Sequence, residues 1–169
     1  MVSENSETIE KLLDKIEHRA QTYWDFMSEK EKSRWAWLAG LIDGEGSIDI
    51  HRSKSKRSLQ ASYVARIAIG MTHKDTILRI KEITGLGYIA KRIQHSNLPT
   101  QKVYYVWTAT TARTAVILRN CLPFLYTKKK HAEVALALIE DIEIHQSDQS
   151  HSRSEYREKL RLLMRDLNK

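Results

Sequence analysis

Apolar and polar residues alternate along this chain with two different periods, which separate the expected helices from the expected strands. Residues 6–33 carry apolar side chains at helical spacing and predict an amphipathic helical extension. Residues 38–47 read Leu-Ala-Gly-Leu-Ile-Asp-Gly-Glu-Gly-Ser and predict an apolar helix from about residue 34 to residue 44. Strict alternation over 47–52 and 61–70 then predicts two paired strands.

The remainder of the chain continues this exchange of helices and strands. In order, the pattern predicts a helix at 74–84 that ends in the Gly85–Gly87 turn, strands at about 88–95 and 102–108, helices at about 111–121 and 129–145, and a charged closing helix. The order α-β-β-α-β-β-α, after the leading helix, predicts an α+β fold with a four-stranded antiparallel sheet backed by helices. We expect an N-terminal helical extension over 1–34 and one domain over 35–169.

The net charge of +7 comes entirely from the middle of the chain. Residues 35–130 hold sixteen Lys and Arg against five acids, whereas 1–34 and 131–169 each hold six against eight. Separated positive charge of this kind is typical of proteins that bind a polyanion. A membrane surface is the competing partner, but it would favour basic residues on an amphipathic helix, and here they fall largely in strand-like segments. The pattern therefore favours nucleic acid over a membrane.

Several classes of protein have no support in the sequence. It contains no run of eighteen apolar residues and no basic leader before a hydrophobic stretch, and its single cysteine, Cys121, suits a reducing compartment. We therefore expect a soluble intracellular protein of the cytoplasm, the nucleoid or an organelle. Zinc-ligand spacings and a phosphate-cradling Gly-x-x-x-x-Gly-Lys sequence are also absent, and we expect no small-molecule substrate.

The apolar helix has two unusual features, acidic residues at its carboxyl end and a stripe of small residues. Asp43 and Glu45 lie where a helix carries partial negative charge, which costs roughly 0.3–1 kcal/mol unless a cation compensates, and a divalent metal is the obvious candidate. Ala36, Gly40 and Gly44 recur every four residues, so a second helix could approach closely. Because the chain holds one such helix, the expected partner is the same helix of a second subunit.

These ten residues closely resemble the signature of the LAGLIDADG homing endonucleases, with Gly44 where alanine is common and Glu45 where the second aspartate is common. Gly-Leu-Gly-Tyr at 85–88 and Pro-Phe-Leu-Tyr-Thr-Lys-Lys-Lys at 123–130 resemble later landmarks of the family in the same order, so the resemblance covers about residues 35–146. It implies an intron-encoded homodimer that cuts both strands of a long, roughly two-fold-symmetric DNA site across the minor groove, leaving 3′ overhangs.

The resemblance also implies the metal site. The family residue matching Glu45 binds the metal, and the carbonyl of Gly44 can contribute. Carboxylates suit Mg²⁺, which activates water and stabilises the leaving oxygen, and Mn²⁺ or Ca²⁺ can occupy the same site. Outside this motif, Glu45 would be read as an ordinary surface acid. Asp43 is assigned first to holding the helix end and, with Ala36, Gly40 and Gly44, to the dimer interface.

Two further residues are candidates for catalysis. Lys128 matches by position the family lysine near the scissile phosphate, although the run of three lysines alone does not separate it from Lys129 or Lys130. His73 stands where the family often has a glutamine that positions the nucleophilic water. Histidine can hold such a water, but a lone histidine at a strand end is as often an ordinary surface group.

The face of the sheet turned away from the helices is the expected DNA-binding surface, because small residues there alternate with polar and basic ones. A merely solvated face is the alternative, but such faces usually mix charges of both signs, and this one carries a single acid. The residues predicted to contact DNA, on this face or in the neighbouring basic segments, are Asp49, His51, Ser53, Lys54, Lys56, Arg57, Arg66, Ala68, Gly70, Ala90, Arg92, Gln94, Lys102, Tyr104, Thr108, Lys129 and Lys130.

Two hypotheses for function remain. The first is a homodimeric, Mg²⁺-dependent, site-specific DNA endonuclease. The second is a maturase-like RNA-splicing or DNA-binding protein that keeps the same fold without cleavage. The presence of Glu45 and Lys128 argues for the enzyme, while the histidine at position 73 leaves room for the binding protein.

Overall fold

One antiparallel sheet with helices on one of its sides makes up the fold. The computed structural model describes residues 2–54, 61–94, 102–145 and 150–169. Its elements are α1 (Val2–Asp25), α2 (Glu29–Glu45), β1 (Gly46–Lys54), β2 (Ala61–Met71), α3 (Lys74–Thr84), β3 (Tyr88–Gln94), β4 (Lys102–Thr110), α4 (Ala112–Cys121), the 3-10 turn η1 (Leu122–Phe124), α5 (Lys129–Ile144) and α6 (His151–Leu167). The predicted α+β order is confirmed.

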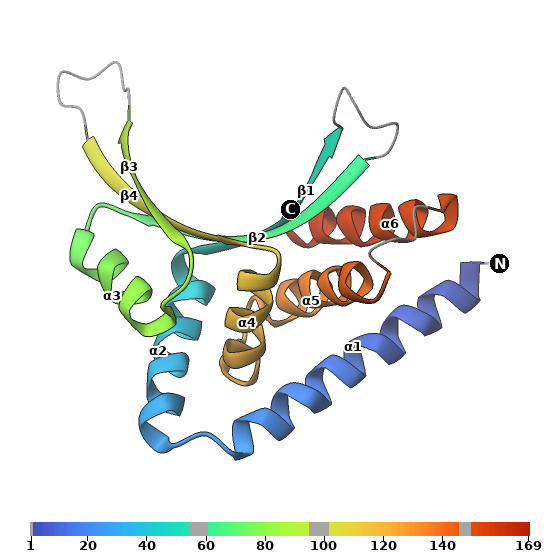
Figure 1. Ribbon diagram of the computed structural model, residues 1–169, viewed down its shortest axis with the longest axis horizontal. Coiled ribbons are helices and arrows are strands. Elements are labelled where there is room, and N and C mark those ends of the chain that lie inside the picture. The colour runs from blue at the N-terminus through green and yellow to red at the C-terminus, as the bar shows by residue number, and fades with distance from the viewer. Residues whose placement is uncertain (1, 55–60, 95–101, 146–149) are drawn as a thin grey trace.

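The sheet has the strand order β1-β2-β4-β3, and every neighbouring pair is antiparallel. The helices lie below the curved sheet in Figure 1, and its upper face is uncovered. Side chains alternate as predicted, since Ile48, Ile67 and Trp107 are fully buried against the helices while their neighbours along each strand point the other way. Among the described side chains, the uncovered face therefore carries the residues that the alternation assigned to it.

The motif helix begins earlier than predicted, and the expected extension over 6–33 is two helices rather than one. Ser28 caps α2 in a capping box, in which its hydroxyl accepts from the backbone N–H of Glu31 at 3.4 Å and the Glu31 carboxylate accepts from the N–H of Ser28 at 3.0 Å. The Ser-x-x-Glu spacing that encodes this cap is visible in the sequence. The domain boundary at residue 34 stays a prediction, and α2 runs through it.

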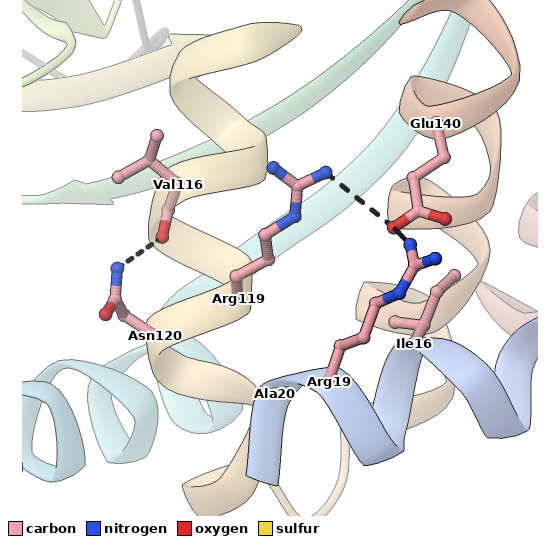
Figure 2. A pocket seen from close by; sticks show the side chains of 7 residues that line it. All are labelled: Ile16, Arg19, Ala20, Val116, Arg119, Asn120 and Glu140. Carbon is pink, nitrogen blue, oxygen red and sulfur yellow. Dashed lines mark hydrogen bonds and ion pairs between the residues drawn. The ribbon is translucent and has the colours of Figure 1, made fainter. Parts of the chain in front are cut away.

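The first helix packs into the same core as the sheet. Leu13, Ile16 and Ala20 of α1 are buried, and α1 lies across the outer side of the helical layer (Figure 1). Arg19 of α1 and Arg119 of α4 both approach the nearly buried carboxylate of Glu140 on α5, at 3.5 and 3.7 Å. Figure 2 shows the two guanidinium groups converging on the same oxygen of the Glu140 carboxylate. A cavity of about 340 Å³ lies beside this contact. The extension is thus part of the packed structure.

A tight turn between α3 and β3 depends on two glycines. Gly85 ends α3 with φ of 64° and Gly87 follows with φ of 76°, both in the left-handed region that glycine tolerates. Around Gly85 there is open space, whereas a Cβ on Gly87 would lie 2.5 Å from Nε1 of Trp107 and 2.7 Å from the carbonyl of Thr108. The Trp107 indole also donates to the carbonyl of Leu86 at 3.0 Å, so the turn is fitted against the core.

Replacing these two glycines with alanine separates backbone strain from crowding. We expect Gly85→Ala to cost about 1 kcal/mol of unfolding free energy from its positive φ alone, and Gly87→Ala about 2–4 kcal/mol because the methyl group also displaces Trp107. Urea unfolding followed by tryptophan fluorescence measures both. Equal costs for the two variants would contradict this account of the turn.

Candidate functional site

The carboxyl end of the motif helix is tied to the turn that leads into α5. The Asp43 carboxylate accepts from the backbone N–H groups of Tyr126 and Lys128, each at 2.8 Å, and from the hydroxyl of Thr127 at 2.9 Å. These three residues lie more than eighty positions later in the chain. Asp43 therefore connects the start of α5 to the end of α2.

Lys128 supplies the positive charge that the helix end requires. Its ammonium group donates to the carbonyl oxygen of Asp43 at 2.6 Å, where the unpaired carbonyls of α2 carry partial negative charge. The predicted compensation is thus made in part by this lysine. In the described residues, Lys129 instead pairs with Glu17 of α1 and Lys130 with Glu133, so the three lysines differ in environment.

The hydrogen bonds change the protonation of Asp43. Partial burial would raise the pKa of its carboxyl group, but the donors from Tyr126, Lys128 and Thr127 outweigh burial and lower the pKa below the usual value. The group is therefore ionised at neutral pH, and it is already engaged by three donors. Because its carboxylate oxygens already accept three hydrogen bonds, Asp43 differs from Glu45, two residues further on.

Glu45 is the last residue of α2, and its side chain is exposed. Over the described parts of the chain it makes no hydrogen bond or ion pair, and no group of three or more His, Cys, Asp or Glu side chains gathers there as a possible metal site. Gly46 allows the helix to pass directly into β1, because a Cβ at that position would lie 2.7 Å from the carbonyl oxygen of Ile42. The carboxylate of Glu45 is thus held at a fixed junction and has no partner among the described residues of its own chain.

The small-residue face of α2 is open in the single chain. A Cβ on Gly40 or on Gly44 would meet no atom within 4 Å, and both residues are exposed. The opposite side of the helix buries Leu38, Ala39 and Ile42 in the core. The helix therefore has an apolar face that is packed and another, built from Ala36, Gly40 and Gly44, that has space for a close neighbour.

His73 acts as the cap of α3. Its Nδ1 accepts from the backbone N–H of Thr76 at 3.3 Å and lies 2.8 Å from the Thr76 hydroxyl. While Nδ1 accepts in this way, the neutral ring carries its proton on Nε2. In that state the exposed side of the ring can donate to a water but cannot take a proton from one. The cap was not expected, although a polar residue just before a helix is the usual sign of one.

The uncovered sheet face holds most of the residues predicted to contact DNA, with differences. Lys56 and Arg57 lie outside the described residues, as do the side chains of Lys54, Gln94 and Lys102. Thr108 points outward between Ala68 and Tyr88 but is 5% exposed, so its expected accessibility is wrong. Tyr88 itself, 54% exposed on the same face, was missed because it stands directly at the start of its strand, next to a turn.

The acid on this face is engaged by its basic neighbours. Asp49 of β1 lies opposite Arg66 of β2, whose Nη2 donates to the carboxylate at 2.7 Å, and the carboxylate is also 2.7 Å from Nε2 of His51. Arg92 on β3 is exposed and makes no such contact within the described structure. Ser53, Gly70, Ala90 and Tyr104 have the outward register expected of them.

Two residues near the helix end were missed by sequence reasoning. Thr127 donates to Asp43, and Tyr126 exposes 89% of its surface beside the same turn. The segment Pro-Phe-Leu-Tyr-Thr was recognised only as a landmark for Lys128. The sequence does contain a clue. Tyr126 stands between the buried Leu125 and Thr127, just after the 3-10 turn, and fits no regular apolar pattern.

An antiparallel sheet with one uncovered face, preceded by a helix that presents an acid at its end, is the arrangement that the comparisons with known proteins can place. The profile of the LAGLIDADG endonuclease family matches residues 38–133. The chain belongs to the LAGLIDADG endonucleases. The DNA endonuclease I-CvuI of Chlorella vulgaris is 26% identical over 116 residues, which span 66% of this chain and 67% of that protein.

Solved structures share the fold. A crystal structure of the homing endonuclease I-CvuI with its target in the presence of Ca has a TM-score of 0.65 at 21% identity, over 80% of this chain and 85% of that one. A DNA complex of the archaeal intron-encoded homing endonuclease I-Vdi141I has a TM-score of 0.68 at 15% identity, over 82% and 86%. Over the described residues of the present chain, no helix is both long enough and apolar enough to cross a bilayer.

Removing the charge of Asp43 is expected to loosen the junction. Because the pKa of this group is lower in the folded than in the unfolded chain, its contribution to stability is full above about pH 4 and is lost as the pH falls through the folded-state pKa. Asp43→Asn should therefore cost about 1–3 kcal/mol at pH 7 and lose less stability than the parent in acid. Urea unfolding at pH 7 and pH 3 measures the difference.

Glu45→Gln is the matched control for this experiment, because it makes the same chemical change at an exposed position without hydrogen bonds. Its unfolding free energy should stay within about 0.5 kcal/mol of the parent at both pH values. If the two variants behaved alike, Asp43 would not be the group that holds the turn.

Proposed function

We propose that this protein is a site-specific, metal-dependent DNA endonuclease that acts as a homodimer on a roughly palindromic target. The observation that carries the proposal is Glu45, an exposed carboxylate with no partner in the described part of the chain, at the end of a helix whose glycine face has open space beside it. A lone acid held in this way is incomplete as a catalytic site. A second copy of the same helix end would complete it.

Pairing of two α2 helices along Ala36, Gly40 and Gly44 would bring two Glu45 carboxylates together. Two such charges repel unless a cation lies between them, which favours a divalent metal at the two-fold axis. Asp43 supports this interface indirectly, since its hydrogen bonds set the position of the helix end. The membership of the family and the double-stranded DNA seen with related proteins support both the dimer and the partner.

The residues present suit a hard cation. The Glu45 carboxylate and the Gly44 carbonyl are oxygen donors of the kind that Mg²⁺ prefers, and Mn²⁺ or Ca²⁺ could take the same place. When bound, the ion would supply an activated water and neutralise charge on the leaving oxygen. The homologue I-CvuI was crystallised with its target in the presence of Ca, and with another target in the presence of Mg.

Other side chains have supporting roles in the proposed reaction. Lys128, already held against the carbonyl of Asp43, places a positive charge beside the helix end, where it would lower the cost of charge developing on the scissile phosphate. His73 would hold a water through Nε2 as a donor, because Thr76 occupies its Nδ1. Arg66, Arg92 and the other outward residues of the sheet would contact DNA, with Lys129 and Lys130 nearer the backbone phosphates.

The library test separates an enzyme from a binding protein. The protein is incubated with a randomised duplex library in Mg²⁺ and, separately, in EDTA, and the ends of cut fragments are sequenced. We expect metal-dependent double-strand breaks at one sequence. Glu45→Gln should reduce cutting below detection while leaving binding to that sequence within about three-fold, because the exposed carboxylate makes no contact with the residues that the structure describes.

Binding without cutting by the parent protein would favour the maturase-like alternative and end the nuclease proposal. Retained cutting by Glu45→Gln would remove this residue from the metal site. Stability measured on the same preparations controls for unfolding, since the substitution is expected to be nearly neutral.

The helix face offers a separate test of the dimer. Gly40→Leu should fold with equal or greater stability, because a side chain at this position meets open space in the single chain and glycine is a poor helix former. It should nevertheless fail to dimerise and fail to cut, since the added bulk blocks close pairing of the helices. Sedimentation velocity measures the assembly, with and without a target duplex.

Glu82→Leu is the matched control, because it adds the same side chain to an exposed position of a different helix, α3. It should leave the sedimentation coefficient and the cutting rate unchanged. A monomeric parent protein on its duplex, or a dimeric Gly40→Leu variant, would contradict the arrangement.

A further inference from the structure

The Asp49 carboxylate grips one edge of the Arg66 guanidinium group. Nε of Arg66 lies 3.2 Å from each carboxylate oxygen, and Nη2 donates to Oδ2 at 2.7 Å. The two residues are direct cross-strand neighbours on the uncovered face of β1 and β2. Because a planar guanidinium held through Nε and Nη2 has no freedom to rotate, the orientation of the arginine is set before any ligand arrives.

The opposite edge of the same guanidinium is available. Nη1 makes no hydrogen bond or ion pair to the described residues, and the Arg66 side chain is 37% exposed against 23% for Asp49. This second edge carries two parallel donors, one N–H of Nη1 and the N–H of Nη2 that Asp49 does not use. Such a pair matches the acceptors O6 and N7 of guanine in the major groove. The arginine therefore presents a base-reading fork away from the acid.

The position of the pair favours a base over a phosphate. Arg66 stands on β2, which has a strand on each side, and its cross-strand neighbours are Asp49 and Thr110. An acid beside an arginine that served only to bind phosphate would weaken attraction to the backbone, because it cancels the positive charge. An acid beside an arginine that reads a base instead fixes the geometry on which discrimination depends. His51, 2.7 Å from the same carboxylate, further neutralises the acid when protonated.

We propose that Asp49 is a positioning residue for specificity, which holds Arg66 so that it reads one guanine in each half of the target. The inference rests on the proposed function for its DNA ligand but not on cleavage. The alternative is a simple ion pair in which Asp49 keeps Arg66 away from DNA. Removing Asp49 would weaken the guanine preference if Asp49 positions Arg66, and would strengthen it if Asp49 only withholds Arg66.

The test measures base preference by binding alone. Duplexes bound in EDTA are selected from a randomised library, and then from one in which each base pair of the selected site is varied singly. The parent protein should prefer guanine at one base pair of each half-site by about 5- to 100-fold over the other bases. Arg66→Ala should lose that preference and keep the others.

Asp49→Ala should lose the same guanine preference by at least about three-fold, while its binding to sequences without that guanine stays equal or becomes tighter, because a negative charge has left the DNA-facing surface. The double variant should match Arg66→Ala in base preference, since the acid sets that preference only through the arginine. Asp49→Asn, which keeps the shape of the side chain, should lie between Asp49→Ala and the parent. Thermal melting confirms that each variant is folded.

Arg92→Ala is the matched control, because Arg92 is also an exposed outward arginine but lies on the edge strand β3, which does not pair with β2. It should leave the guanine preference at the Arg66 base pair unchanged. Its own effect on binding free energy should add to that of Asp49→Ala. If Asp49→Ala instead sharpened the preference at the Arg66 base pair, or if no base pair depended on Arg66, the proposal would be overturned.

Failure of this inference is distinguishable from failure of the nuclease proposal. A protein that cuts one site but shows no guanine preference dependent on Arg66 keeps the enzyme and loses the positioning role. A protein that binds with that preference but never cuts loses the enzyme and keeps the positioning role. Absence of specific binding to any duplex would overturn both.

Discussion

The grip of Asp43 on residues 126–128 is the contact on which the candidate site depends. It joins the end of α2 to the start of α5 through two backbone N–H groups and one hydroxyl, and in doing so it places the Lys128 ammonium against the same helix end. Without this contact, Lys128 would lose its connection to the end of the motif helix. One carboxylate is thus used for structure, which leaves the other, two residues later, available for chemistry.

The same division of labour recurs on the sheet. Asp49 is engaged by Arg66 and His51, and the buried acid Asp141 on α5 is engaged by Arg153 and Arg157 at 2.9 and 2.6 Å. In each case an acid inside a basic or buried environment is neutralised by close donors, as buried charge requires. Glu45 is the contrast, an acid for which the described chain provides no cation.

Much of the fold could be predicted from the sequence because the apolar pattern is strong. The alternation over 61–70 placed Arg66 outward and Ile67 inward correctly, and the glycine pair at 85 and 87 marked its turn. The Ser-x-x-Glu spacing of the capping box at Ser28 is also present in the sequence. The helical spacing of apolar residues continues up to it, so the end of α1 at Asp25 was not predicted. The accessibility of Thr108 could not be predicted, since it depends on the packing of side chains from two neighbouring strands around it.

The candidate site was less predictable than the fold, for a physical reason. Family resemblance pointed to Glu45 and Lys128 as candidates, but the hydrogen bonds that join Lys128 to Asp43 span more than eighty residues and leave no local pattern. The cap made by His73 and the ion pair of Arg66 likewise depend on rotamers. Periodicity reports which side of an element a residue occupies and says nothing of which neighbour it engages.

Glu45 is followed directly by Gly46, the first residue of β1. No loop separates the group proposed for chemistry from the surface proposed for reading bases, so the position of one constrains the position of the other. A duplex seated out of register on the sheet would carry its scissile bond out of reach of the carboxylate. Fidelity of cutting would then follow from chain connectivity, with no separate checking step required.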